Sequence, residues 1–232
     1  MLFDALFSGN FSWSVILPSI ISSIIIIFFT LPLHEWAHAF VATKLGDPTP
    51  GYQGRLTLNP FAHIDYFGAL TLIFLGVGWA KPVQVNSRYF KNVKRDMLLT
   101  AAAGPVMNLL IAFIFMIFLN VYSVIAMPIL NSSNFDVLNI IYSVIYYYIN
   151  INVFLAIFNL IPIPPFDGSR ILFALLPVRA YLKVMEYERY FKYIVLILIF
   201  SSVGSGILST IADKVFNALW FVASLPFGNL LG

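Results

Sequence analysis

Residues 5–33 contain no charged side chain, and most of them are apolar. A helix needs about 20 such residues to cross the hydrocarbon core of a bilayer. The composition agrees, because 60% of the 232 residues are hydrophobic and 10% are charged, whereas a soluble domain carries about 25% charged residues. The sequence therefore predicts an integral membrane protein. It contains no cysteine, so disulfides and thiolate metal sites are excluded.

A cluster of ionisable residues, His34, Glu35 and His38 in the order HEWAH, follows this apolar run. We expect one helix from about Trp13 to Leu45, on which residues four apart share a face, so the two histidines can bind one metal ion. Glu35 lies beside that face, where it can take a proton from a metal-bound water. A chance match to the motif, or a satisfied histidine pair, is the alternative. Ionisable residues at membrane depth are costly, which favours a functional site.

Further apolar segments alternate with polar ones along the rest of the chain. We predict an all-α polytopic membrane protein with a three-helix catalytic core, a re-entrant loop with a short β element and at least one extra C-terminal transmembrane helix. It forms a single membrane-embedded domain over residues 1–232, with a core at about 13–176 and C-terminal transmembrane and interfacial helices at 187–232. The expected elements after the first helix are a loop at 46–66 with a strand at Gly54–Leu58, a short apolar segment at Phe67–Trp79, spans at 97–126 and 137–160, a short interfacial helix at Ser169–Leu176, a span at Tyr193–Ala212 and an interfacial or partly spanning tail at Val215–Gly232.

The distribution of basic residues predicts the orientation of the chain. If the N-terminus is outside and the first three spans cross in turn, all 13 Lys and Arg residues except Lys214 lie on the cytoplasmic side. This requires Phe67–Trp79, which is too short to span, to dip into the bilayer and return on the same side. The net charge of +3 is thereby explained by membrane orientation, and no nucleic-acid partner is expected.

A third metal ligand is expected from the other end of the core. The predicted orientation places Asp167, just past the end of the third span, at the same depth as His34 and His38. Two histidines, one carboxylate and an open fourth position are typical of a catalytic zinc site. A turn or helix-cap role is the alternative for Asp167, because Asp-Gly is a common turn pair.

Several motifs together resemble the site-2 protease family of intramembrane zinc metalloproteases, in its short prokaryotic branch. They are, in order, HEWAH, GRLTLNPFAHID (54–65), GWAKPV (78–83), AGPVMN (103–108) and the segment from Asn159 to Gly168. The resemblance implies one Zn²⁺ per chain, bound by His34, His38 and Asp167, with Glu35 as the catalytic acid and base. It also implies that Asn159 engages the substrate or the oxyanion, and that the segment after the first helix presents the substrate as an extended strand.

The expected function is hydrolysis of peptide bonds within or near transmembrane segments of membrane-anchored proteins, in a bacterial or archaeal cell membrane. The expected partners are a single-pass substrate and the lipid bilayer; the oligomeric state is not predicted. A metal-binding transporter and an inactive helix-binding scaffold are the alternatives. Asn108 either faces the site or makes a structural hydrogen bond, and His63 is expected to have a loop or supporting role rather than to bind metal.

Overall fold

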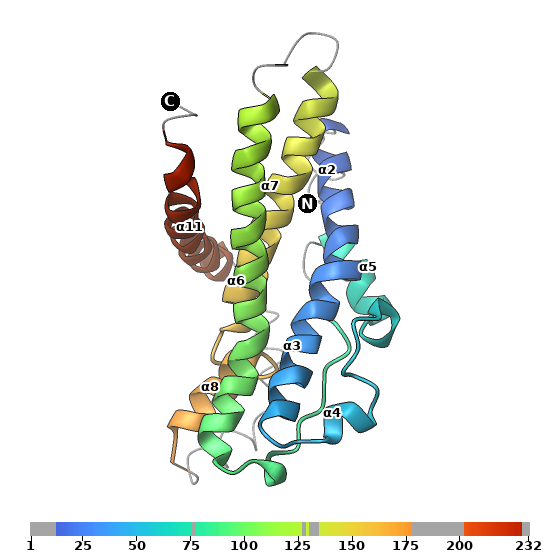
Figure 1. The fold of residues 1–232 in the computed structure, drawn as a ribbon, viewed down its shortest axis with the longest axis vertical. Coiled ribbons are helices and arrows are strands. Elements are labelled where there is room, and N and C mark those ends of the chain that lie inside the picture. Colours follow the sequence, from blue (N-terminus) through green and yellow to red (C-terminus); the bar gives the residue numbers. More distant parts are fainter. Residues whose placement is uncertain (1–12, 76–77, 127–128, 130–134, 178–201, 229–232) are drawn as a thin grey trace.

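A computed structural model describes residues 13–75, 78–126, 129, 135–177 and 202–228, which are mostly helical (Figure 1). Three long helices lie side by side along the longest axis: the first helix (Trp13–Lys44), α6 (Val93–Ala126) and α7 (Phe135–Asn159). α6 runs antiparallel to the other two (Figure 1). Four helices among the described residues are long and apolar enough to cross a membrane, namely Trp13–Lys44, Val93–Ala126, Phe135–Asn159 and Gly206–Phe227.

The predicted first helix is continuous but contains one π-helical turn. α2 (Trp13–Ile25) passes into η1 (Ile26–Thr30) and then into α3 (Leu31–Lys44). The backbone N–H of Leu31 donates to the carbonyl of Ile26, five residues back. Pro32 follows immediately and has no N–H to donate, so the regular i to i−4 ladder is interrupted here. Within the π turn the carbonyl of Ile26 stays hydrogen-bonded, and the helix continues to the histidines.

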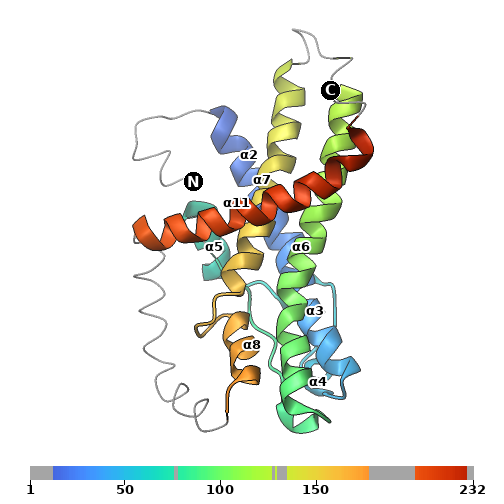
Figure 2. The same cartoon turned by 90° about the vertical axis from the view of Figure 1, so that its left-hand side faces the viewer.

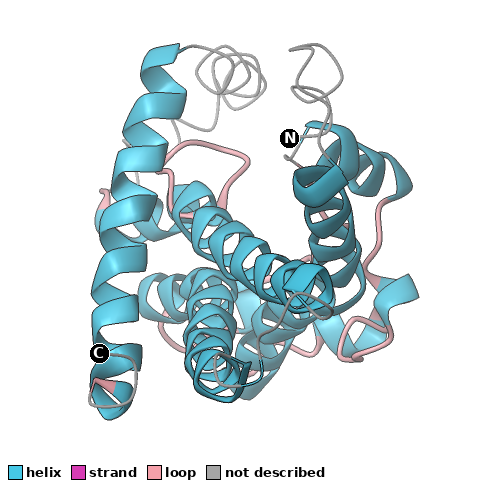
Figure 3. Ribbon diagram, turned by 90° about the horizontal axis from the view of Figure 1, so that it is seen from above, coloured by secondary structure: helices cyan, strands magenta, loops and turns pink. Residues whose placement is uncertain are grey.

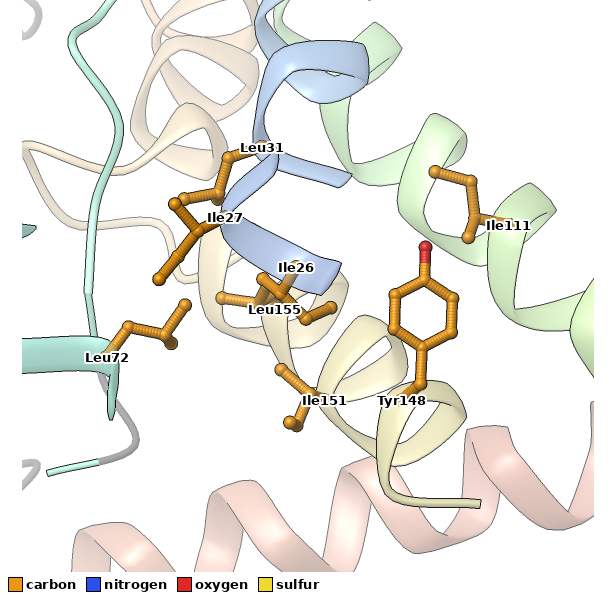
Figure 4. Packing of buried hydrophobic residues seen from close by; sticks show 8 residues of the cluster. All are labelled: Ile26, Ile27, Leu31, Leu72, Ile111, Tyr148, Ile151 and Leu155. Carbon is orange, nitrogen blue, oxygen red and sulfur yellow. The ribbon is translucent and has the colours of Figure 1, made fainter. Parts of the chain in front are cut away.

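The three long helices pack through buried apolar side chains near the π turn. Figure 4 shows this cluster, which comprises Ile26, Ile27 and Leu31 of the first helix, Leu72 of α5, Ile111 of α6, and Tyr148, Ile151 and Leu155 of α7. The Tyr148 hydroxyl lies 2.8 Å from Thr30 Oγ1, so a polar contact also joins the first helix and α7. Lipid tails are as apolar as these side chains, so van der Waals packing and such hydrogen bonds hold the helices together.

The chain between the first helix and α6 is mostly irregular. It contains α4 (Thr49–Tyr52), η2 (Pro60–Ala62), α5 (Tyr66–Leu75) and η3 (Ser87–Tyr89). α5 has 10 residues, about 15 Å at 1.5 Å per residue, which agrees with the prediction that this segment is too short to span.

The predicted strand at Gly54–Leu58 is wrong, because these described residues form turns and bends. Gly54 has a left-handed φ of 65°, and the Asn59 side chain accepts from the Phe61 N–H at the start of η2. Turn hydrogen bonds therefore take the place of strand pairing. The only β pairing in the described part of the chain is an isolated antiparallel bridge between Ile64 and Ala80.

The C-terminal part differs from the prediction. α8 (Asp167–Leu175) matches the expected short helix, whereas α11 (Ser202–Ser224) continues past the expected end at Ala212 and is followed by η5 (Leu225–Phe227). The first part of the predicted span, residues 193–201, lies outside the described residues. α11 crosses α6 and α7 obliquely on one side of the bundle (Figures 2 and 3). Ala212 and Ala223 are buried against α6 and α7, and their small side chains allow this close crossing.

Candidate metal centre

Three predicted metal ligands lie close together in space, although they are far apart along the chain. His34 and His38 lie one turn apart on α3, with 3.1 Å between their Nε2 atoms. Asp167 is the first residue of α8, and its Oδ2 lies 3.3 Å from His34 Nε2 and 3.2 Å from His38 Nε2. Both histidines are buried. The three atoms therefore form a nearly equilateral triangle.

The size and chemistry of this triangle fit a zinc ion. Zinc bonds of about 2.0–2.1 Å in tetrahedral geometry place neighbouring ligand atoms about 3.3 Å apart. The two nitrogens and the carboxylate oxygen also belong to the ligand types that zinc prefers. Three acceptor atoms this close together repel one another unless a proton or a cation lies among them. The donor set thus suits a single divalent cation that binds all three.

The other nitrogen of each imidazole has a partner on α6. His38 Nδ1 lies 2.7 Å from the Thr100 carbonyl oxygen, which can only accept, so His38 Nδ1 carries the proton. His34 Nδ1 lies 3.2 Å from Asn108 Oδ1. With a proton on each Nδ1, each Nε2 that gives up its own proton can present a lone pair to a metal ion in the triangle, which is the tautomer that a metal ligand needs.

Gly104 allows α6 to come this close to the histidines. A Cβ atom at this position would lie 2.3 Å from His38 Nε2 and 2.5 Å from His34 Nε2. No side chain atom fits at such distances, so glycine leaves open the space beside the two ligand nitrogens.

Asp167 is delivered by the proline-rich turn that follows α7. The adjacent Gly168 packs against the end of α7, where a Cβ atom would lie 2.2 Å from the Leu160 carbonyl oxygen. Burial tends to raise the pKa of Asp167, but attraction to His38 and hydrogen bonds from His34 and His38 hold that pKa well below its usual range. The carboxylate is therefore ionised at neutral pH, and a metal ion can replace the proton that the imidazoles supply.

Glu35 is buried beside the triangle and is held by the backbone of a distant segment. Its Oε2 accepts a hydrogen bond of 2.9 Å from the Val83 N–H. Val83 belongs to the irregular stretch between α5 and α6. Hydrogen bonds hold this stretch in place both before and after Val83. The Lys81 N–H donates to the His63 carbonyl at 2.8 Å, and the Asn86 N–H donates to Asp47 Oδ2 at 2.7 Å. The carboxylate of Glu35 is thus fixed in orientation.

Two further residues singled out in the sequence lie outside the triangle. Asn159, at the end of α7, donates from Nδ2 to the Leu155 carbonyl at 2.9 Å, so its role toward a substrate stays a prediction. His63 is fully buried in the loop, where its Nε2 lies 2.8 Å from the Thr57 carbonyl oxygen. That contact agrees with a loop role.

Sequence reasoning did not find the Thr100 carbonyl or the Val83 amide. Both are backbone groups. Every residue has a backbone carbonyl and every residue except proline has a backbone N–H, so the residue type at a position does not predict these contacts. Asn108 and Gly104 were visible within the AGPVMN motif, but their contacts with the imidazoles depend on how α6 packs against α3.

A model of peptidase family M50 matches residues 22–202, which is most of the chain. The chain belongs to this family. Among related proteins, it is 38% identical to the candidate zinc metalloprotease YwhC of Bacillus subtilis over 216 residues, 93% of this chain and 95% of that protein. It is 28% identical to the candidate zinc metalloprotease MJ0611 of Methanocaldococcus jannaschii over 60% of this chain and 62% of that protein. No solved structure matches it significantly.

Rip2 of Mycobacterium tuberculosis, also named as a candidate zinc metalloprotease, is 31% identical over 37% of this chain and 34% of its own length. Membership of peptidase family M50 and the apolar helices identify this M50 protein as a membrane metalloprotease. The residues of the triangle lie inside the segment that the family model matches.

Proposed function

We propose that this M50 peptidase is an intramembrane zinc metalloendopeptidase that cleaves single-pass proteins within or near their transmembrane segments. The observation that carries the proposal is the convergence of His34, His38 and Asp167 beside the buried carboxylate of Glu35, at the end of an apolar helix. In the proposed site, the first three residues hold one zinc ion. When bound, the ion acts as a Lewis acid toward water and the scissile carbonyl.

Glu35 is the proposed general base and general acid. Its Oε2 is engaged by the Val83 N–H, so Oε1 is the oxygen that takes the proton of the attacking water and returns it to the leaving amine. Asn159 is proposed to donate to the oxyanion that develops on the substrate. An amide nitrogen carries two protons, so its bond to the Leu155 carbonyl leaves one N–H for that purpose.

The proposed substrate must unwind locally before it is cleaved, because a helix shields each peptide bond within its own hydrogen bonds. The irregular chain between the first helix and α6 borders Glu35 at Val83, so it is the proposed partner for the unwound stretch. We further propose that the N-terminus is outside and the site lies near the cytoplasmic side of a bacterial or archaeal cell membrane. The basic residues support this orientation through the positive-inside rule.

The proposal is tested with purified chain reconstituted into liposomes together with a single-pass reporter protein. Removal of zinc with a chelator is expected to abolish cleavage, and an equimolar amount of Zn²⁺ is expected to restore it. Cleavage is measured by mass spectrometry of the products, which also locates the cut. Products that do not end in or near the transmembrane segment, or cleavage that persists without metal, would contradict the proposal.

The hydrogen bond to Glu35 can be tested by removing a single N–H. Val83→Pro is expected to slow cleavage about ten- to a hundredfold, because a hydrogen bond to a charged group contributes about 1.5–3 kcal/mol. Zinc content should not change, since the three proposed ligands are unaltered. Val83→Ala, which keeps the N–H, is the matched control for the lost side chain. Equal rates for the proline and alanine variants would show that this hydrogen bond does not orient the carboxylate.

A further inference from the structure

Asn108 makes an unusual set of contacts in the middle of α6. It is 1% exposed, and its Oδ1 lies 3.2 Å from His34 Nδ1. Its Nδ2 is buried and has no hydrogen-bond partner among the described residues. A buried polar atom without a partner costs free energy, so packing alone does not account for an asparagine here.

Other asparagines of α6 and α7 behave differently. In four cases Nδ2 donates to the backbone carbonyl four residues back, at 2.8 or 2.9 Å: Asn120 to Met116, Asn150 to Tyr146, Asn152 to Tyr148 and Asn159 to Leu155. This intrahelical bond is the ordinary way for an asparagine to satisfy its amide within an apolar bundle. Asn108 instead turns its side chain so that Oδ1 faces His34 and Nδ2 remains without a partner.

We propose that Asn108 is a positioning residue for the metal centre, which holds His34 in the tautomer with a proton on Nδ1. The acceptor oxygen of Asn108 requires a proton on Nδ1, and this leaves the lone pair of Nε2 for the metal. His38 obtains the same effect from the Thr100 carbonyl, a backbone group. The two ligands of α3 are therefore oriented by two turns of one neighbouring helix. This inference rests on the proposed zinc site but not on the proposed proteolysis.

The experiment measures the zinc dissociation constant of the full-length purified chain by competition with a chelator of known affinity. Asn108→Leu removes the acceptor at similar volume and is expected to weaken zinc binding about 10- to 100-fold. Asn108→Asp keeps an acceptor and is expected to bind zinc at least tenfold more tightly than Asn108→Leu. Asn120→Leu is the matched control, because Asn120 is equally buried on the same helix but bonds only within it. It should bind zinc like the wild type.

A second readout is the visible absorption spectrum of the chain loaded with Co²⁺ in place of Zn²⁺. Asn108→Asp is expected to shift the cobalt bands, because a carboxylate acceptor makes the His34 imidazole a stronger donor. This readout decides the matter if Asn108→Leu does not fold. Affinities that are equal for Asn108→Leu and either the wild type or Asn120→Leu would overturn the inference, as would an unshifted cobalt spectrum. A wild-type chain that binds no zinc would instead refute the metal site itself.

Discussion

Glu35→Gln is expected to retain zinc and to lose peptide-bond cleavage. The substituted amide keeps the size of the side chain, but it cannot take a proton from water at neutral pH. General acid–base catalysis typically contributes about 10²–10⁴-fold, so the rate should fall by at least a hundredfold. The proposed zinc ligands His34, His38 and Asp167 are untouched, and metal content should stay at one ion per chain. Rates are measured with a single-pass reporter in liposomes, and zinc by elemental analysis of the same samples.

Asp213→Asn provides the control for this variant. It makes the same chemical change to a carboxylate on α11, where Asp213 is exposed, and it should cleave at the wild-type rate. In cells, fragments of membrane proteins that accumulate with the wild type and are missing with Glu35→Gln would identify substrates. If the glutamine variant cleaves as fast as the wild type, Glu35 is not the base. If it loses its zinc, the lost cleavage says nothing about proton transfer.

Gly104→Ala is expected to disrupt metal binding with the addition of a single methyl group. That carbon would lie 2.3 Å from His38 Nε2 and 2.5 Å from His34 Nε2, so either α6 must move away or the imidazoles must rotate. Both movements separate the ligand atoms from the positions that a tetrahedral ion needs. Zinc affinity should therefore fall by more than the roughly 10- to 100-fold that accompanies the loss of an outer hydrogen-bond partner. Chelator competition measures this change.

The matched control is Gly206→Ala on α11, where an added Cβ atom has nothing within 4 Å. Replacing a helical glycine with alanine favours the helix by about 1 kcal/mol, so this control should fold and bind zinc normally. Circular dichroism of the two variants shows whether the helices persist. Gly104→Ala with wild-type zinc affinity would mean that α6 lies farther from α3 than the structure places it.

The sequence predicted the parts of this fold that depend on length and charge. Uncharged segments of sufficient length predicted the three long helices, and the brevity of the apolar segment around Leu72 indicated that it is too short to span. The strand at Gly54–Leu58 was wrong because alternating residues such as Leu56 and Leu58 suit a strand only where a partner strand exists. The course of α11 past Ala212 was missed because Asp213 and Lys214 look like the end of an apolar span, whereas in the structure both are exposed on the helix surface.

The candidate ligands were predictable for a different reason. The spacing of His34 and His38 fixes their common face on any helix, and Asp167 was then the carboxylate that the expected orientation placed at the same depth. The structure brings these three residues together. The contacts that orient them were not predictable, because they depend on the rotation of α6 about its own axis. Periodicity is a weak guide to that rotation in a helix with apolar residues on every side.

The ligand triangle has a consequence for the biosynthesis of the protein. His38 and Asp167 are 129 positions apart in the chain, so a ribosome must finish all three long helices before the last ligand leaves the exit tunnel. Until then the nascent chain offers only two imidazoles, which hold zinc far more weakly than three ligands do. With the proposed ligand set, a truncated or partly inserted product therefore lacks a complete metal centre, and peptidase activity arises only once all three long helices have been made.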